Sequence, residues 1–273
     1  IFATGDLVCY DFDGNLKWGK NIGAPKNPYG HASSLIALDD LLFVQMDQKK
    51  AGNLFAYKLA DGAEAWNAAR TEASWASPVL VPMPAGVQLL LSAQTMVTAY
   101  APKDGAKVWD FKCLDGEVAP GLAWDGKLFF AMNEYAMATA FKVNEGTPPT
   151  PEMVWEWDES LPDISSPVAA GGFVFVGTSR AEIVCVDAAE GKTLWTHEFA
   201  DAFHASPIVA GDRVYAVDLS GNMSVFKVAG TYEAIAESKL DAPVAATPAI
   251  LDKRMYIRTN THLICVEESG AAK

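Results

Sequence analysis

One phrase returns four times along the chain and limits its fold more than any other feature. It consists of an apolar run, a turn that closes with glycine, and a second run that opens with tryptophan. In each copy the tryptophan stands four residues after the glycine, at Gly14 and Trp18, Gly62 and Trp66, Gly105 and Trp109, and Gly191 and Trp195. The copies follow at intervals of 48, 43 and 86 residues, the last being twice 43. Because turn signals recur inside each unit, this spacing indicates one array of small structural units.

Each unit divides into four short strands, which we label a to d. The fifth unit shows them most clearly, because the Gly171-Gly172 pair separates two apolar runs. Its predicted strands are Ile164–Ala170, Phe173–Gly177, Glu182–Val186 and Thr193–Phe199. Short apolar runs separated by glycine-bearing turns are hairpin signals, and helical periodicity is not sustained anywhere. Four-stranded antiparallel units of about 40 residues, stacked in series, predict an all-β fold of the β-propeller class.

The pattern predicts a single propeller domain over residues 1–273 with seven blade signals, five complete and two partial. The predicted blades are residues 1–23 (partial), 29–70, 74–113, 118–158, 163–199, 203–240 and 244–268 (partial). In the first blade, Ile1–Thr4 is interpreted as the end of a strand b, and in the last, Ser269–Lys273 follows strand c without a strand d. The first blade lacks strand a and part of strand b, and the last lacks strand d, so the two ends cannot pair into one complete blade. We therefore expect the chain to be truncated at its N-terminus.

Three units depart from the pattern in ways that predict local structure. Pro82–Gly86 is predicted to be the loop between strands a and b of the third unit. Thr147–Pro151 is predicted to be a surface loop between c and d of the fourth unit, because proline cannot donate to a strand ladder. In the sixth unit, Ile235 is predicted to take the place of the tryptophan.

Composition and charge exclude several classes of function. Half of the residues are hydrophobic and 11% are aromatic, which excludes disorder for most of the chain. The formal net charge of −13 disfavours binding to nucleic acid or to an anionic membrane surface. No apolar run is long enough to span a membrane, and no signal-peptide pattern occurs at the first residues.

Cys9, Cys185 and Cys265 occupy the same point of three different units. Because equivalent positions in separate units are too far apart for disulfides, we expect these cysteines to act as small buried apolar residues.

The phrase Asp187–Trp195, preceded by Ser165–Val168 and Phe173–Gly177, resembles the repeat of pyrroloquinoline-quinone (PQQ)-type propellers. That family includes quinoprotein alcohol dehydrogenases and the barrel-assembly lipoprotein of the outer membrane. The resemblance covers nearly the whole chain, with further Ser-Pro or Thr-Pro elements at Ser77, Ser206 and Thr247. It implies a parent of eight blades and a periplasmic or secreted location. It is specific for the fold and weak for activity, since enzymes and binding scaffolds both carry it.

Two other propeller families share the period and match less well. Kelch repeats need a glycine pair in each unit, and only Gly171-Gly172 offers one. WD40-like repeats place Trp-Asp at the end of a strand, whereas Trp109-Asp110 and Trp157-Asp158 stand at the start of one.

The family resemblance also implies a role for the repeated tryptophans. In PQQ-type propellers these residues pack between blades as a girdle, an arrangement called tryptophan docking. A wide, flat aromatic ring at the start of each outer strand would fix the spacing of adjacent sheets. The residues expected to be structural are Trp18, Trp66, Trp109, Trp155 and Trp195.

Propellers bind ligands at the axis, so the loops ahead of each strand a predict a binding mouth. The candidates are Tyr29, His31, Trp75, Glu117, Asp163, Phe203 and His204. Their functional interpretation is a small-molecule or peptide site, and the alternative is ordinary loop capping. His31 and His204 lie four blades apart, so a shared metal ion is not expected.

The sequence favours a non-catalytic, extracytoplasmic propeller that binds a protein or small molecule, with no cofactor, metal or catalytic residue. The alternative is a PQQ- and calcium-dependent alcohol or sugar dehydrogenase. The resemblance implies that such an enzyme needs a catalytic Asp, a calcium site, a tryptophan floor and often adjacent cysteines. Trp75 could imitate the floor and Glu117 or Asp163 a ligand, but their spacing does not support it. Asp11–Asn15 lacks the glycine and glutamate positions of a calcium loop and is predicted to be a turn.

Overall fold

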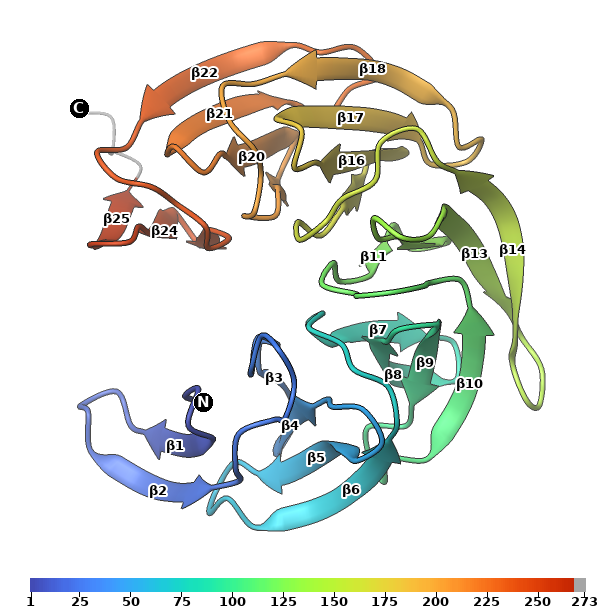
Figure 1. Cartoon of the computed structure of the whole chain (residues 1–273), viewed down its shortest axis with the longest axis vertical. Coiled ribbons are helices and arrows are strands. Elements are labelled where there is room, and N and C mark those ends of the chain that lie inside the picture. Colours follow the sequence, from blue (N-terminus) through green and yellow to red (C-terminus); the bar gives the residue numbers. More distant parts are fainter. Residues whose placement is uncertain (268–273) are drawn as a thin grey trace. The chain divides into compact units, whose positions relative to one another are not determined.

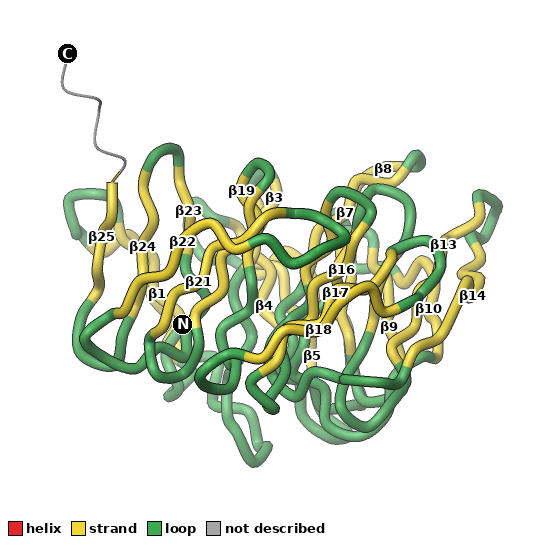
Figure 2. The backbone as a smooth tube through the Cα atoms, turned by 90° about the horizontal axis from the view of Figure 1, so that it is seen from above, coloured by secondary structure: helices red, strands yellow, loops and turns green. Residues whose placement is uncertain are grey.

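A computed structural model describes residues 1–267, and all of its regular structure in that range is β (Figure 2). Its 25 strands form seven antiparallel sheets, of which five have four strands. The first sheet has two strands and the last has three. Within each sheet the strands pair in chain order, as Figure 1 shows. The predicted all-β fold with seven blade signals is therefore confirmed, while residues 268–273 lie outside the described range.

The first three sheets contain ten strands. The first sheet holds β1 (Asp6–Tyr10) and β2 (Leu16–Asn21). The second holds β3 (Ile36–Leu38), β4 (Leu41–Met46), β5 (Gly52–Lys58) and β6 (Glu64–Arg70). The third holds β7 (Val79–Met83), β8 (Gly86–Ser92), β9 (Met96–Tyr100) and β10 (Lys107–Lys112).

The remaining four sheets contain fifteen strands. The fourth sheet holds β11 (Ala123–Trp124), β12 (Phe129–Ala131), β13 (Ala138–Asn144) and β14 (Thr150–Trp157). The fifth holds β15 (Val168–Ala170), β16 (Phe173–Gly177), β17 (Glu182–Asp187) and β18 (Thr193–Glu198). The sixth holds β19 (Ile208–Ala210), β20 (Arg213–Val217), β21 (Asn222–Lys227) and β22 (Ala234–Lys239). The seventh holds β23 (Ala249–Leu251), β24 (Arg254–Arg258) and β25 (Leu263–Glu267).

The chain groups into two compact units, and the division falls within the fourth sheet. The first unit comprises Ile1–Leu122, Ala131–Ala136 and Lys142–Glu152. The second comprises Ala123–Phe130, Met137–Phe141 and the chain from Met153 onward. Each unit has its own core between neighbouring sheets, centred on Phe43 and Leu89 in the first and on Phe175 and Phe226 in the second. The middle strands are buried on both faces, which explains their unbroken apolar runs.

The outer hairpin of most sheets carries the same β-bulge. Trp18 pairs with Cys9, Trp195 pairs with Cys185, and the register shifts directly after each pair. In the sixth sheet the residue in this register is Ala236, which pairs with Val225. The prediction that Ile235 replaces the tryptophan is therefore wrong by one position. Ile235 is the extra residue of the bulge. The turn before it spans residues 227–233, one residue more than residues 187–192 of the fifth sheet, so counting from the turn gives the wrong position.

The repeated tryptophans contact the sheet that follows them in the chain. Four indole N–H groups donate to backbone carbonyls of the next turn between strands c and d. The pairs are Trp18 to Leu59 at 2.8 Å, Trp66 to Pro102 at 3.0 Å, Trp155 to Ala188 at 3.0 Å, and Trp195 to Ala229 at 3.2 Å. Three of these rings also cover the turn glycine of the next sheet, namely Gly62, Gly105 and Gly191. Trp109 differs, because it donates to the Gln88 side chain of its own sheet at 2.8 Å.

The Ser-Pro elements join the inner strands of adjacent sheets. Ser34 N–H donates to the Ser77 hydroxyl at 3.0 Å, and Ser206 N–H donates to Thr247 at 2.9 Å. Ser166 N–H makes the same bond to Ser206 at 2.9 Å. The hydroxyl in this motif thus satisfies a backbone donor of the preceding sheet, which explains why serine or threonine recurs before the proline.

Three predicted boundaries are corrected by the strand ends. Ile1–Thr4 is not a strand, because Phe2 and Gly5 close a local turn through their backbone bonds. Pro82 lies inside β7 and pairs with Val87, which is possible because β7 is an edge strand and needs no donor on its outer side. The loop of the fourth sheet ends at Pro149, since Thr150 opens β14.

The cysteine prediction holds at only one of the three equivalent positions. Cys185 is buried, Cys9 is half-buried and Cys265 is exposed. Cys265 lies on β25, and no fourth strand covers β25 within residues 1–267.

Candidate functional site

The first unit brings together three of the predicted mouth residues. Tyr29, Trp75 and Glu117 lie in the loops that precede β3, β7 and β11 respectively. The Tyr29 and Trp75 rings meet edge to face, with centroids 4.9 Å apart and planes at 74°. The Tyr29 hydroxyl donates to Glu117 Oε2 at 3.0 Å, although the two residues are 88 positions apart. Loops from three successive sheets therefore converge on one cluster, which we call the aromatic–carboxylate site.

A pocket of about 290 Å³ opens at this site. Its lining residues are Lys26, Asn27, Pro28, Lys49, Ala73, Trp75, Gln94, Gly116 and Glu117. The Trp75 indole N–H donates to Asn27 Oδ1 at 3.3 Å, and Asn27 in turn donates to the Asp47 carbonyl at 2.9 Å. The pocket thus combines an aromatic wall, a carboxylate and two lysines, with its tryptophan held in one orientation.

Buried polar groups hold the loop that carries Glu117. Asn133 is fully buried, and its Nδ2 donates to the carbonyls of Asp115 at 2.5 Å and of Glu117 at 2.9 Å. The backbone N–H of Trp75 donates to the Val118 carbonyl at 2.9 Å. Gly116 has φ of +65°, and a Cβ there would lie 2.8 Å from Tyr135. Only glycine therefore fits between the Glu117 loop and Tyr135.

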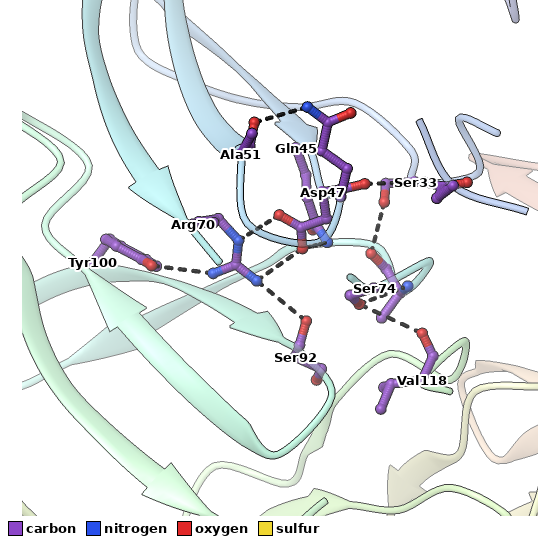
Figure 3. A network of polar contacts seen from close by, with 12 residues as sticks. Ser33, Gln45, Asp47, Ala51, Arg70, Ser74, Ser92, Tyr100 and Val118 are labelled. Carbon is purple, nitrogen blue, oxygen red and sulfur yellow. Dashed lines mark hydrogen bonds and ion pairs between the residues drawn. The ribbon is translucent and has the colours of Figure 1, made fainter. Parts of the chain in front are cut away.

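Asp47, whose backbone carbonyl accepts from Asn27 of the site, also forms a buried ion pair with Arg70 (Figure 3). Arg70 donates from Nε to Asp47 Oδ1 at 2.6 Å and from Nη2 to Asp47 Oδ2 at 2.9 Å. Arg70 also donates to the Tyr100 hydroxyl at 3.1 Å, while Gln45 donates to Asp47 at 2.8 Å. Burial raises the pKa of the Asp47 carboxyl, and Arg70 opposes that shift. Burial would lower the pKa of Arg70, but the Asp47 carboxylate outweighs burial and raises it.

The other mouth candidates do not join this cluster. His31 is half-buried, burial lowers the pKa of its imidazole, and its Nε2 has no hydrogen-bond partner. Asp163, Phe203 and His204 belong to the second unit. Phe203 packs in the core with Phe175, so as a site candidate it is corrected to a core residue. Asp163 and His204 are half-buried.

Sequence reasoning missed the residues that support the site. Asp47 and Arg70 are 23 positions apart, and Asn133 lies in the loop after β12, 18 and 16 positions from the Asp115 and Glu117 carbonyls that it holds. The only sequence signal was the presence of a charged or amide residue after an apolar strand b, which also fits an ordinary turn.

Two thiols with a raised pKa and the lack of a metal-ligand group characterise residues 1–267. Within residues 1–267, no three His, Cys, Asp or Glu side chains are grouped as a metal site. Burial raises the pKa of both Cys113 and Cys185 to about 12, so these thiols are protonated and are poor nucleophiles. The described part of the chain contains no helix that could cross a membrane.

Solved structures with the same fold define the class of protein. BamB from Moraxella catarrhalis is 13% identical with a TM-score of 0.77, covering 96% of this chain and 78% of that one. Saccharomyces cerevisiae Sqt1 is 10% identical with a TM-score of 0.70, covering 97% and 80%. A europium-containing methanol dehydrogenase is 11% identical with a TM-score of 0.64, covering 93% and 69%. The chain thus has the β-propeller fold.

The particular family follows from the sequence itself. The family profile described as outer membrane protein assembly factor BamB matches residues 2–147 and 93–233. These matches span most of the chain, and the chain therefore belongs to that family. A search of curated protein sequences gave no match.

Proposed function

We propose that this protein is a non-catalytic, extracytoplasmic propeller that binds an extended segment of a partner protein at the aromatic–carboxylate site. The observation that carries the proposal is the convergence of three loops on one cluster, in which Trp75 and Glu117 line a pocket and Tyr29 contacts both of them. The name of the matched family, an outer membrane protein assembly factor, supports a location outside the cytoplasm and a protein as the partner.

The side chains of the site suit the recognition of a peptide. Tyr29 is 64% exposed although it is aromatic, and Glu117 is also exposed. Exposed tyrosine and tryptophan supply much of the binding energy in protein interfaces, since they combine large apolar area with a polar group. Because the Trp75 indole is held by Asn27, little rotamer freedom is lost when a ligand packs on it.

The proposal includes a structural role for the repeated tryptophans. We infer that Trp18, Trp66, Trp155 and Trp195 dock each sheet onto the next, which would hold the mouth loops in register. Their indole N–H bonds to the following turn support this role. Trp109 makes a different bond and is considered separately below.

Peptide binding tests the proposed function directly. Fluorescein-labelled peptides with the alternating aromatic and polar pattern of outer-membrane strands would be titrated with the full chain and followed by anisotropy. Replacing Trp75 by alanine should weaken binding by roughly 30-fold, the effect of losing about 2 kcal/mol at a hot spot. The control is Phe12→Ala, since Phe12 is a fully exposed aromatic on another turn. No binding by the unmodified chain, or equal affinity of the two variants, would overturn the proposal.

The alternative function, a PQQ- and calcium-dependent dehydrogenase, is not favoured by the residues of the site. Trp75 could lie under a quinone, but Glu117 already accepts a hydrogen bond from Tyr29. The described residues contain no group of three acidic, histidine or cysteine ligands beside it. Isothermal titration with PQQ and calcium is therefore expected to give no heat of binding. Saturable binding in the micromolar range would instead support the enzyme.

A further inference from the structure

A second pocket lies where the repeat breaks down, between the third and fourth sheets within the first unit. It has a volume of about 400 Å³ and is lined by Met83, Pro84, Ala85, Gln88, Val143, Asn144, Glu145, Gly146, Thr147 and Pro149. All of these residues come from two places, the β7–β8 hairpin and the β13–β14 turn with the end of β13.

The β7–β8 turn differs in chemistry from its equivalents. The corresponding two-residue turns are Asp39-Asp40, Gly171-Gly172, Gly211-Asp212 and Asp252-Lys253. In the third sheet the turn is Pro84-Ala85, and both residues are exposed. Val87 beside them is 37% exposed. An apolar turn therefore faces solvent where the other sheets present charged residues or glycine.

The β13–β14 turn differs as well, and the two departures meet at the same pocket. Residues 145–149 keep a glycine, Gly146, but follow it with two prolines, Pro148 and Pro149, and a Cβ on Gly146 would meet the Pro148 backbone instead of a tryptophan ring. The Trp109 indole N–H donates to Gln88 Oε1 of its own sheet at 2.8 Å. The pocket between the two turns therefore has rigid walls that contain Pro84 on one side and Pro149 on the other.

The orientation of Gln88 gives the pocket a defined polar floor. Because the Trp109 indole can only donate, the oxygen of the Gln88 amide must face it. Gln88 is 5% exposed, so its position is fixed by packing as well as by this bond. The pocket therefore has apolar walls from Met83 and Pro149 around a buried amide, which suits an apolar side chain together with a peptide carbonyl.

Charge selects among the peptides that could enter. Glu145 is the only charged residue that lines the pocket, and it is exposed. We propose that this pocket is a second peptide-binding site, for a partner segment that inserts one apolar side chain and places a lysine or arginine beside Glu145. The overall charge of −13 would also attract a basic segment. This site is separate from the aromatic–carboxylate site and shares none of its lining residues.

A charge-swap experiment tests the second site. Two labelled peptides, one containing Trp-Lys and the other Trp-Glu in the same Gly-Ser background, would be titrated with the full chain. The unmodified protein should prefer the Trp-Lys peptide by roughly tenfold, because Glu145 attracts the lysine and repels the glutamate, and Glu145→Lys should reverse that preference. The matched control is Glu190→Lys, because Glu190 also precedes the glycine of an exposed c–d turn. It should leave both affinities unchanged.

Two further variants keep the test decisive. Met83→Asp should weaken both peptides, because it puts a charge on an apolar wall of the pocket. Trp75→Ala should change neither, so failure of the second site would be distinguishable from failure of the proposed function. Thermal unfolding would show that each variant folds. No preference between the peptides, or the same response to Glu145→Lys and Glu190→Lys, would overturn the proposal.

Discussion

At the scale of single residues, the buried ion pair of Asp47 and Arg70 links the stability of the fold to the position of the site residue Asn27. The side chains are 0% and 4% exposed, and Asp47 also supplies the carbonyl that holds Asn27 beneath Trp75. A buried carboxylate is tolerated only because a guanidinium and an amide donate to it. Any change that removes one partner leaves the other charged and unpaired inside the protein.

Replacing Arg70 by alanine should therefore be strongly destabilising. We expect a loss of about 3–5 kcal/mol, measured as a lower urea midpoint, because Asp47 would stay buried without a cation. The control is Arg213→Ala, since Arg213 lies 3.8 Å from Asp212 and both are exposed. That variant should cost less than about 1 kcal/mol. Equal losses for the two variants would show that the buried pair does not have the role assigned to it.

At the scale of the sheets, three of the repeated glycines, Gly62, Gly105 and Gly191, have two functions. They adopt positive φ in the turn, and they leave room for the tryptophan of the preceding sheet. Gly191 has φ of +69°, and a Cβ there would lie 2.6 Å from Trp155. Gly211 has φ of +62°, yet a Cβ there would meet nothing within 4 Å. Comparing Gly191 with Gly211 therefore separates the need for positive φ, which both share, from the need for space beside a tryptophan ring, which only Gly191 has.

Comparison of Gly191→Ala with Gly211→Ala tests the tryptophan contact. Both variants should lose about 1–2 kcal/mol from the left-handed backbone. Gly191→Ala should lose roughly 1–3 kcal/mol more, because the new methyl group displaces the Trp155 ring. Urea unfolding of the two variants gives the difference. If both lose the same amount, the ring contact adds nothing to the stability of the joint.

The elements also show what sequence patterns can and cannot predict. Strand β16 was predicted with both of its ends, because alternating turn glycines and apolar runs are local signals. Ala236 was missed because the c–d turn of the sixth sheet is one residue longer than that of the fifth, which shifts the register without changing the composition. The bonds from Tyr29 to Glu117 and from Arg70 to Asp47 join residues far apart in the chain, so no local pattern contains them. The repeat identified the loops that form the site, but the contacts between those loops depend on packing.

At the scale of the whole molecule, repetition of one sheet gives equivalent loops, and function arises where their sequences differ. The loops before β3, β7 and β11 contribute a tyrosine, a tryptophan and a glutamate to a single site. The β7–β8 and β13–β14 turns break the repeat and form a separate pocket. The central claim is that the first group of loops acts as one binding surface.

Hydrogen–deuterium exchange of the full chain, with and without a bound strand-type peptide, tests that claim most directly. Amides in residues 26–29, 73–75 and 116–118 should all become more protected when the peptide binds, because one ligand would cover loops from three sheets. Protection of only one of these loops, or of none while the peptide is bound, would contradict the account.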